Sequence, residues 1–131
     1  MPRPMRPRYT DLFRRMRDPD QVLADAAFDA VLFDRADALP DLVECYQTSR
    51  DGKMRFDVVQ LLGFTESPHA VPVLVAALDD KDPSVRAEAC RALEDVRAVV
   101  AIPTLEARLT DVDSDVRHAA AEALASLRAS G

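Results

Sequence analysis

The fold is decided by residues 67–97, SPHAVPVLVAALDDKDPSVRAEACRALEDVR, because residues 98–128, AVVAIPTLEARLTDVDSDVRHAAAEALASLR, repeat the same pattern 31 positions later. The two stretches are identical at 13 of 31 positions. The shared residues include Pro72/Pro103, Leu74/Leu105, Leu78/Leu109, Asp80/Asp111, Asp82/Asp113, Val85/Val116, Arg86/Arg117 and Leu93/Leu124. Self-similarity at a fixed period of this length indicates an array of stacked structural units.

Two less regular copies precede this pair. Residues 36–66 align with it through Asp51, Arg55 and Leu62. Residues 9–35 form a more degenerate copy, in which a second helix after Asp18-Pro19 carries the apolar set Val22, Leu23, Ala26, Ala27, Ala30 and Val31. The sequence therefore predicts one domain over residues 9–131, built from repeats 9–35, 36–66, 67–97 and 98–128, after a Pro/Arg segment at residues 1–8.

Each repeat is predicted to form two helices, because apolar residues recur at steps of three and four on both sides of an acidic turn. In residues 67–97, Ser67 is suited to cap the first helix, with Pro68 at its first position. Asp82-Pro83 does the same for the second helix. A single hairpin cannot bury both of its faces, so the pattern predicts an all-α, right-handed α-solenoid of three to four hairpins.

The motifs of residues 61–93 resemble the HEAT repeat, in particular the short bacterial type also found in phycobilisome lyases. They are Leu61-Leu62-Gly63, Ala70-Val71-Pro72-Val73-Leu74, Leu78-Asp79-Asp80, Asp82-Pro83-Ser84-Val85-Arg86 and Ala89-Cys90-Arg91-Ala92-Leu93. The resemblance implies a binding surface for another protein, since HEAT-like arrays mostly serve in this way. It also implies structural roles for two ladders of residues along the stack, Asp51/Asp82/Asp113 and Arg55/Arg86/Arg117, which cap the second helices and bond across neighbouring repeats.

Composition supports a helical, soluble chain. Hydrophobic residues make up 48% of the 131 positions, aromatic residues only 5%, and there are 3 glycines. No apolar stretch approaches the length of a bilayer span and residues 1–8 lack the apolar core of a signal peptide, so we expect a cytoplasmic protein. The bias toward arginine over lysine fits a bacterial source. Cys45 and Cys90 stand apart from each other and from histidine, which favours buried thiols over a disulfide or zinc site.

Charge is distributed unevenly. Residues 1–17 hold six arginines and one aspartate, a net charge of +5. The net charge of the whole chain is −6, so the remaining residues carry a net charge of −11. An acidic body repels nucleic acid, and a nucleic-acid partner is not expected except through the basic segment. That segment is predicted to be extended, because prolines alternate with its arginines.

Catalytic and metal-binding patterns are absent from the sequence. Asp111-Val112-Asp113-Ser114-Asp115 has the acidic spacing of a calcium loop, but Val116 stands where that loop needs glycine. His69 and His118 are each followed by alanine, whereas HEAT-like di-iron hydroxylases bind metal through repeated His-Glu pairs. No cofactor, metal or catalytic residue is therefore expected.

The expected function is a non-catalytic adaptor that binds a partner on the surface lined by the second helices. A mainly acidic groove there would suit a basic helix or tail. Phe56 and Phe64 are either exposed anchors or packed beneath the first repeat. The candidate partner-binding residues are Phe56, Asp57, Gln60, Phe64, Glu88, Arg91, Asp95, His118 and Glu122.

Three alternatives stay open. The chain is an accessory subunit of a lyase-like or other enzyme complex, a nucleic-acid binder through its basic segment, or a homodimer through its terminal helices. The last of these rests on the Ala-rich final helix, which suits close packing against another subunit.

Overall fold

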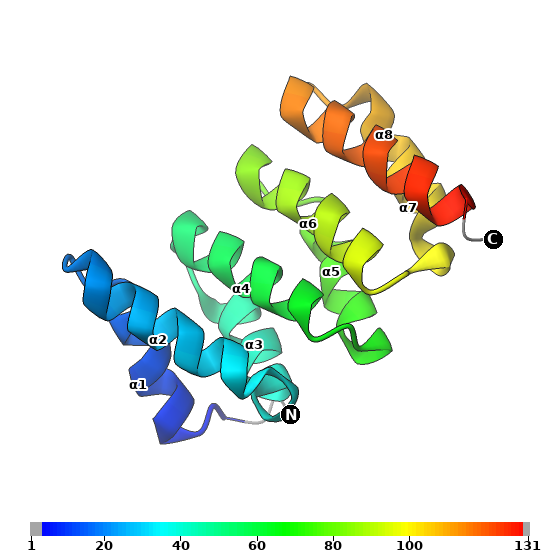
Figure 1. Ribbon diagram of the computed structural model, residues 1–131. Coiled ribbons are helices and arrows are strands. Elements are labelled where there is room, and N and C mark those ends of the chain that lie inside the picture. Colours follow the sequence, from blue (N-terminus) through cyan, green and yellow to red (C-terminus); the bar gives the residue numbers. More distant parts are fainter. Residues whose placement is uncertain (1–3, 130–131) are drawn as a thin grey trace.

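The computed structural model describes residues 4–129, which form four helical hairpins stacked side by side in a curved array (Figure 1). Within these residues the secondary structure is helical, with no strand. This confirms the predicted all-α solenoid. The hairpins are α1 (Pro7–Arg15) with α2 (Gln21–Phe33), α3 (Arg35–Thr48) with α4 (Gly52–Phe64), α5 (Val71–Ala77) with α6 (Pro83–Asp95), and α7 (Ile102–Ala107) with α8 (Ser114–Ala129). Short 3₁₀ turns lie at Pro68–Ala70, Val99–Ala101 and Arg108–Thr110.

The second helix of every hairpin starts at an aspartate of the 31-residue repeat. The carboxylate of each accepts a hydrogen bond from a backbone N–H two residues on, which satisfies a donor that the helix cannot pair internally. The pairs are Asp20 with Val22 (3.0 Å), Asp51 with Lys53 (3.0 Å), Asp82 with Ser84 (2.9 Å) and Asp113 with Asp115 (2.9 Å). Local sequence thus sets where each second helix begins.

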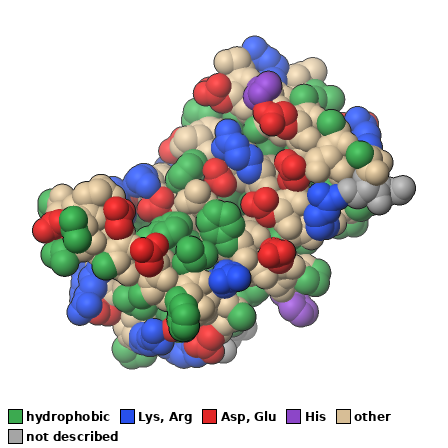
Figure 2. Space-filling view, in the orientation of Figure 1, with side chains coloured by type: hydrophobic (Ala, Val, Ile, Leu, Met, Phe, Trp, Pro, Cys, Tyr) green, Lys and Arg blue, Asp and Glu red, His purple; other side chains and the backbone are tan. Residues whose placement is uncertain are grey.

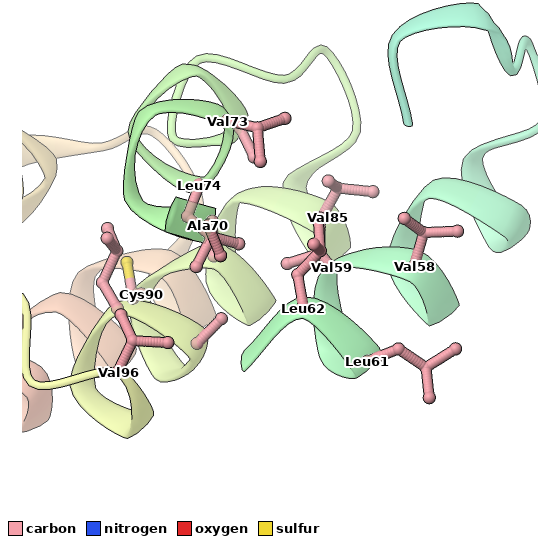
Figure 3. Close-up of a cluster of buried hydrophobic side chains, with 14 of the residues drawn as sticks. Val58, Val59, Leu61, Leu62, Ala70, Val73, Leu74, Val85, Cys90 and Val96 are labelled. Carbon is pink, nitrogen blue, oxygen red and sulfur yellow. The ribbon is translucent and has the colours of Figure 1, made fainter. Parts of the chain in front are cut away.

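The core lies between the row of first helices and the row of second helices. Figure 3 shows side chains from α4, from α5 with its preceding turn, and from α6 meeting in one cluster, among them Leu62, Leu74 and Val85. Cys45 and Cys90 belong to this core as free, buried thiols. Each hairpin therefore buries its apolar residues against its neighbours, as a solenoid requires.

Gly63 lets α4 and α6 approach each other closely. A Cβ atom built on it would lie 2.9 Å from both the Cα and the Cβ of Ala92. That spacing is too short for any side chain, so glycine is required at this position by the neighbouring backbone.

The first hairpin differs from the sequence prediction. Ala27 and Val31 are buried, but Val22, Leu23 and Ala26 are exposed, and Ala24 is buried instead. The predicted apolar set of α2 was therefore partly wrong. The reason is positional: α2 lies at one side of the array, where the described chain has no further hairpin to cover its outer face.

The basic segment at residues 1–8 is only partly the extended arm that was predicted, because Arg6 is extended but is followed at once by a helix. Residues 1–3 lie outside the described residues, but α1 already begins at Pro7. Arg6 binds the buried carboxylate of Asp41 (2.7 Å) and that of Asp37 (3.3 Å), and Arg8 pairs with Asp34. These arginines are held by the acidic body of the chain itself.

Candidate functional site

At two places in the array, an arginine of one second helix makes the same two-bond contact with an aspartate in the turn of the next hairpin. Arg55 of α4 donates from Nε and Nη2 to the carboxylate of Asp80, at 2.9 and 3.1 Å. Arg86 of α6 donates in the same way to Asp111, at 3.0 Å for both bonds. We call this two-pronged contact the clasp. Bidentate contacts of this kind combine charge with fixed geometry, so each clasp sets the position of one hairpin on the next.

The clasp aspartates are also held by their own turns. Oδ1 of Asp80 accepts a bond from the backbone N–H of Asp82 (2.9 Å), and Tyr46 donates its hydroxyl to Oδ2 (2.7 Å). Burial alone would raise the pKa of Asp80, but the bonds from Arg55, Asp82 and Tyr46 outweigh it, and the pKa is lowered. Asp80 is therefore held as a carboxylate between two hairpins.

No clasp joins the first and second hairpins, because both of its positions are occupied by other residue types. Ala24 stands 31 residues before Arg55, and Ser49 stands 31 residues before Asp80. At this junction Arg17 pairs instead with the capping residue Asp51, and Arg35 donates to the carbonyl oxygen of Phe64 (2.8 Å). α2 consequently packs loosely along α4, whereas α4, α6 and α8 are closely packed.

Two hollows follow the seam between α2 and α4. One, of about 560 Å³, lies at the carboxyl ends of the helices and is lined by Leu32, Arg35, Gly63, Phe64, Glu66 and Asp95. The other, of about 260 Å³, lies nearer their amino ends, and its lining includes Asp25, Phe28, Lys53, Asp57 and Gln60. Because α2 and α4 run side by side, the hollows lie one after the other. We call them together the seam groove.

The seam groove combines a few apolar side chains, such as Leu32, Phe64 and Phe28, with charged ones. In Figure 2, which shows this face, hydrophobic side chains gather over α2 and α4 and carboxylates surround them. Among the described residues the carboxylates of Glu66 and Asp95 have no basic partner, whereas Lys53 is already paired with Asp57 (2.6 Å). Partial burial, with the nearby carboxylates of Glu94 and Glu66, raises the pKa of Asp95. A cation entering the groove would relieve this repulsion.

Two predicted partner-binding residues are largely buried. Asp57 and Glu88 are each only 7% exposed, although Asp57 still contributes to the wall of the smaller hollow. Asp57 on α4 and Glu88 on α6 occupy the same repeat position, on the side of the helix that faces a neighbouring second helix. Lys53 and Arg91 cover the two carboxylates, with Arg91 lying 3.2 Å from Glu88. Burial raises the pKa of Glu88, and Arg91 counteracts that effect.

The two phenylalanines differ in their surroundings. Phe56 is half-buried against the core, with the Lys53 ammonium 5.4 Å from its ring centre. Phe64 is exposed on the wall of the larger hollow. Of the two, only Phe64 lines the seam groove.

The remaining candidates are distributed over three helices. Gln60 and Asp95 line the seam groove, from α4 and α6. Arg91 lines a separate hollow of about 360 Å³ at the amino ends of α4, α6 and α8, together with Phe56. His118 and Glu122 are exposed on α8, where they contact each other away from the groove. The structure thus brings together only some of the predicted surface.

Several groove residues were missed by sequence reasoning. Phe28, Leu32, Asp25, Arg35 and Glu66 lie in the degenerate first repeat or in inter-helix segments, where the repeat pattern offers little guidance. A usable signal exists, however: the substitutions at positions 24 and 49 are visible once the clasp positions of the later repeats are known.

Neither a metal cluster nor a membrane span is found in the part of the chain that the structure describes. Residues 4–129 contain no group of three or more His, Cys, Asp or Glu side chains arranged to hold a metal ion. None of their helices combines the length and apolarity that crossing a bilayer would need.

The family follows from the repeat itself. A family model for HEAT repeats matches residues 39–125, about two thirds of the chain. The chain belongs to the HEAT-repeat family. The match covers the hairpins joined by clasps and omits the first hairpin, so the seam groove lies at the boundary between regular and divergent repeats.

Solved structures resemble this HEAT-repeat chain over nearly its whole length. Human deoxyhypusine hydroxylase in complex with glycerol matches with a TM-score of 0.69 and 25% identity, covering 92% of this chain and 43% of the hydroxylase. An engineered protein matches at 0.64 and 24% identity, covering 94% and 63%. The complex of CpcE and CpcF of phycocyanin lyase from Nostoc sp. matches at 0.55 and 19% identity, covering 97% and 67%. The last two show the fold alone, and this chain spans less than half of the hydroxylase. No curated protein matches its sequence.

Proposed function

We propose that this HEAT-repeat chain is a non-catalytic scaffold that binds a segment of another protein in the seam groove. The observation that carries the proposal is the missing clasp between the first two hairpins, at whose junction the two hollows of the seam groove lie. Membership in a family of repeat arrays, whose extended faces commonly bind proteins, supports this interpretation.

The chemistry of the groove favours a basic, amphipathic segment. Leu32 and Phe64 offer apolar contact, and an exposed aromatic side chain is a frequent centre of binding energy. Glu66 and Asp95 offer negative charge at the same end of the groove. A helix or tail with apolar residues on one side and Lys or Arg beside them would satisfy both requirements.

The proposal of a non-catalytic role rests on the side chains that the groove presents. Its cationic groups are engaged: Lys53 with Asp57, Arg17 with Asp51, and Arg35 with a backbone carbonyl. The groove residues include no histidine, cysteine or serine placed beside a base. What the groove offers is shape and charge, which serve recognition.

Affinity capture tests the proposal. The purified chain and a Glu66→Lys/Asp95→Lys variant are used as baits in a lysate of the source cells, and bound proteins are identified by mass spectrometry. The matched control is Asp79→Lys/Glu106→Lys, which makes the same change in charge at exposed positions of the first-helix side. We expect a partner that the chain and the control retain and the groove variant loses. A partner retained equally by all three baits would contradict the groove as its site.

A further inference from the structure

The two outer faces of the array carry the two halves of one clasp. In the interior of the array, the arginine of one hairpin reaches the aspartate of the next: Arg55 to Asp80, and Arg86 to Asp111. The same repeat positions also occur in the outermost hairpins, where the described chain provides no neighbour.

Arg117 is the arginine of the fourth hairpin. Its Nη1 donates to the backbone oxygen of Asp111 at 2.7 Å, as Nη1 of Arg86 donates to the backbone oxygen of Asp80 at 2.9 Å. The turn of its own hairpin therefore holds the Arg117 guanidinium as the corresponding turns hold the other clasp arginines. Its Nε and Nη2, which in Arg86 bind the next aspartate, meet no acceptor among residues 4–129.

Asp18 is the matching aspartate of the first hairpin, since it stands 62 residues, or two repeats, before Asp80. Its Oδ1 accepts a bond from the backbone N–H of Asp20 at 2.8 Å, which is the turn geometry of the clasp aspartates: Asp111 accepts from Asp113 at 2.9 Å. Within the described chain no arginine pairs with Asp18. Its carboxylate is thus held in place without the cation that its counterparts receive.

Apolar positions on both faces are uncovered as well. Leu23 is 54% exposed, although its counterparts in α4, α6 and α8 are all buried. On the opposite face Leu109 is 39% exposed, whereas its counterpart Leu78 is fully buried, and Ala121 is exposed where Cys90 is buried. Outer faces of repeat arrays need polar surfaces to stay in water, and these positions have retained the apolar character of internal repeats.

The face of the first hairpin is also hollowed beside the aspartate. Leu12, Asp18, Leu23, Ala26 and Ala30 line a depression of about 340 Å³. In the later repeats the positions of Leu23 and Ala30 receive the preceding second helix. The small residues of α8 that face outward, Ala121 and Ala125, leave room for close packing of that kind.

We propose that this chain associates head to tail with a second copy of itself, so that the α7–α8 face of one copy covers the α1–α2 face of the next and Arg117 clasps Asp18 of that copy. The proposal does not rest on a partner in the seam groove, although Asp18 also lines the smaller hollow of that groove. Each copy carries the clasp arginine on one outer face and the clasp aspartate on the other. The contact is therefore heterologous, and it continues the solenoid from one copy to the next.

Sedimentation velocity of the purified chain over a concentration series from micromolar to millimolar tests this contact. We expect the weight-average sedimentation coefficient to rise with concentration. Asp18→Asn retains the bond to the Asp20 N–H but loses the charge, and Arg117→Gln retains a donor; each should weaken association about tenfold or more, because a charge-assisted bidentate contact is lost. Circular dichroism of both variants confirms that they remain folded.

The charge-swapped double variant, Asp18→Arg/Arg117→Asp, provides the sharpest control. It restores opposite charges across the contact and should associate more strongly than either single neutral variant. A chain that stays monomeric up to millimolar concentration would overturn the proposal. Association that is equally strong in Asp18→Asn and Arg117→Gln would do so too, since it would place the contact elsewhere.

Discussion

The guanidinium of Arg55 donates two bonds to the carboxylate of Asp80 in the turn of the following hairpin, with both side chains more than nine-tenths buried. Arg86 repeats this contact with Asp111 one hairpin later. A buried charged pair thus lies at each regular boundary of the stack, beside the apolar core. Between the first two hairpins the clasp is absent, charged pairs of another kind such as Arg6–Asp41 and Arg17–Asp51 join them, and the seam groove lies at this junction.

Arg55→Ala should destabilise the chain by about 3–5 kcal/mol, because it leaves the buried carboxylate of Asp80 without its cation. Urea unfolding followed by circular dichroism measures the effect. Arg128→Ala is the control, since it removes an exposed pair with Glu106 and should cost at most about 1 kcal/mol. Equal losses in the two variants would show that the clasp does not stabilise the stack.

Stability should fall as the solution becomes more acidic than the ordinary aspartate pKa of 3.8. The pKa values of Asp80 and Asp111 are lowered in the folded chain, because the bonds from Arg55, Arg86 and the turns outweigh burial. Carboxylates with a lowered folded pKa contribute stability above their unfolded pKa and lose it as the pH falls through the folded one. Urea midpoints measured from neutral pH into this acid range should therefore decline, and in Asp80→Asn/Asp111→Asn they should decline less. An unchanged decline in that variant would assign the acid sensitivity to other carboxylates.

Gly63→Ala reverses the usual effect of alanine in a helix. Alanine in place of an internal helix glycine ordinarily stabilises by about 0.5–1 kcal/mol. Here the new methyl group would lie 2.9 Å from the backbone of Ala92, so α4 and α6 must separate and we expect a loss of about 1–3 kcal/mol. Ala92→Gly in the same chain should restore part of that loss. A stabilised Gly63→Ala variant, measured by urea unfolding, would show that the helices are not so close.

Both thiols should be inert in the folded chain. Burial raises the pKa of Cys45 to about 12 and that of Cys90 to about 11, so neither forms appreciable thiolate near neutral pH. Iodoacetamide at mildly alkaline pH should leave the native chain unmodified and alkylate both cysteines after unfolding, as intact mass shows. Labelling of either thiol in the native chain would indicate local opening of the core.

The regular part of the fold was accessible from sequence because it depends on local signals that recur. Asp82 and Pro83 start α6 for reasons contained in one turn, and the spacing of Val85, Ala89 and Leu93 specifies the buried side of that helix. The 31-residue period then predicts that the hairpins stack on one another. The same reasoning found Arg86 but not its acceptor, because Asp111 lies in the next hairpin and only the packed array brings the two together.

The proposed binding surface was harder to predict from the sequence for a related reason. The pattern of apolar residues along one helix shows which side faces the other helix of its hairpin. A second helix in a stack is also covered by the second helices on either side, and that pattern does not show this. Asp57 and Glu88 fall on such a covered side and are buried. Glu66 and Leu32, in contrast, reach the groove because α2 stands away from α4, which is a property of the junction and is visible in sequence only as Ala24 and Ser49.

The most direct test of the seam groove is fluorescence anisotropy with two labelled helical peptides, one amphipathic with leucine and lysine and the other with leucine and glutamate in place of lysine. The chain and the control Asp79→Lys/Glu106→Lys should bind the lysine peptide about tenfold or more tightly than the glutamate peptide, because only the lysine peptide complements Glu66 and Asp95. Glu66→Lys/Asp95→Lys should lose that preference. Equal binding of both peptides by the unmodified chain, or a preference that survives in the groove variant as in the control, would contradict the seam groove as a site for basic segments.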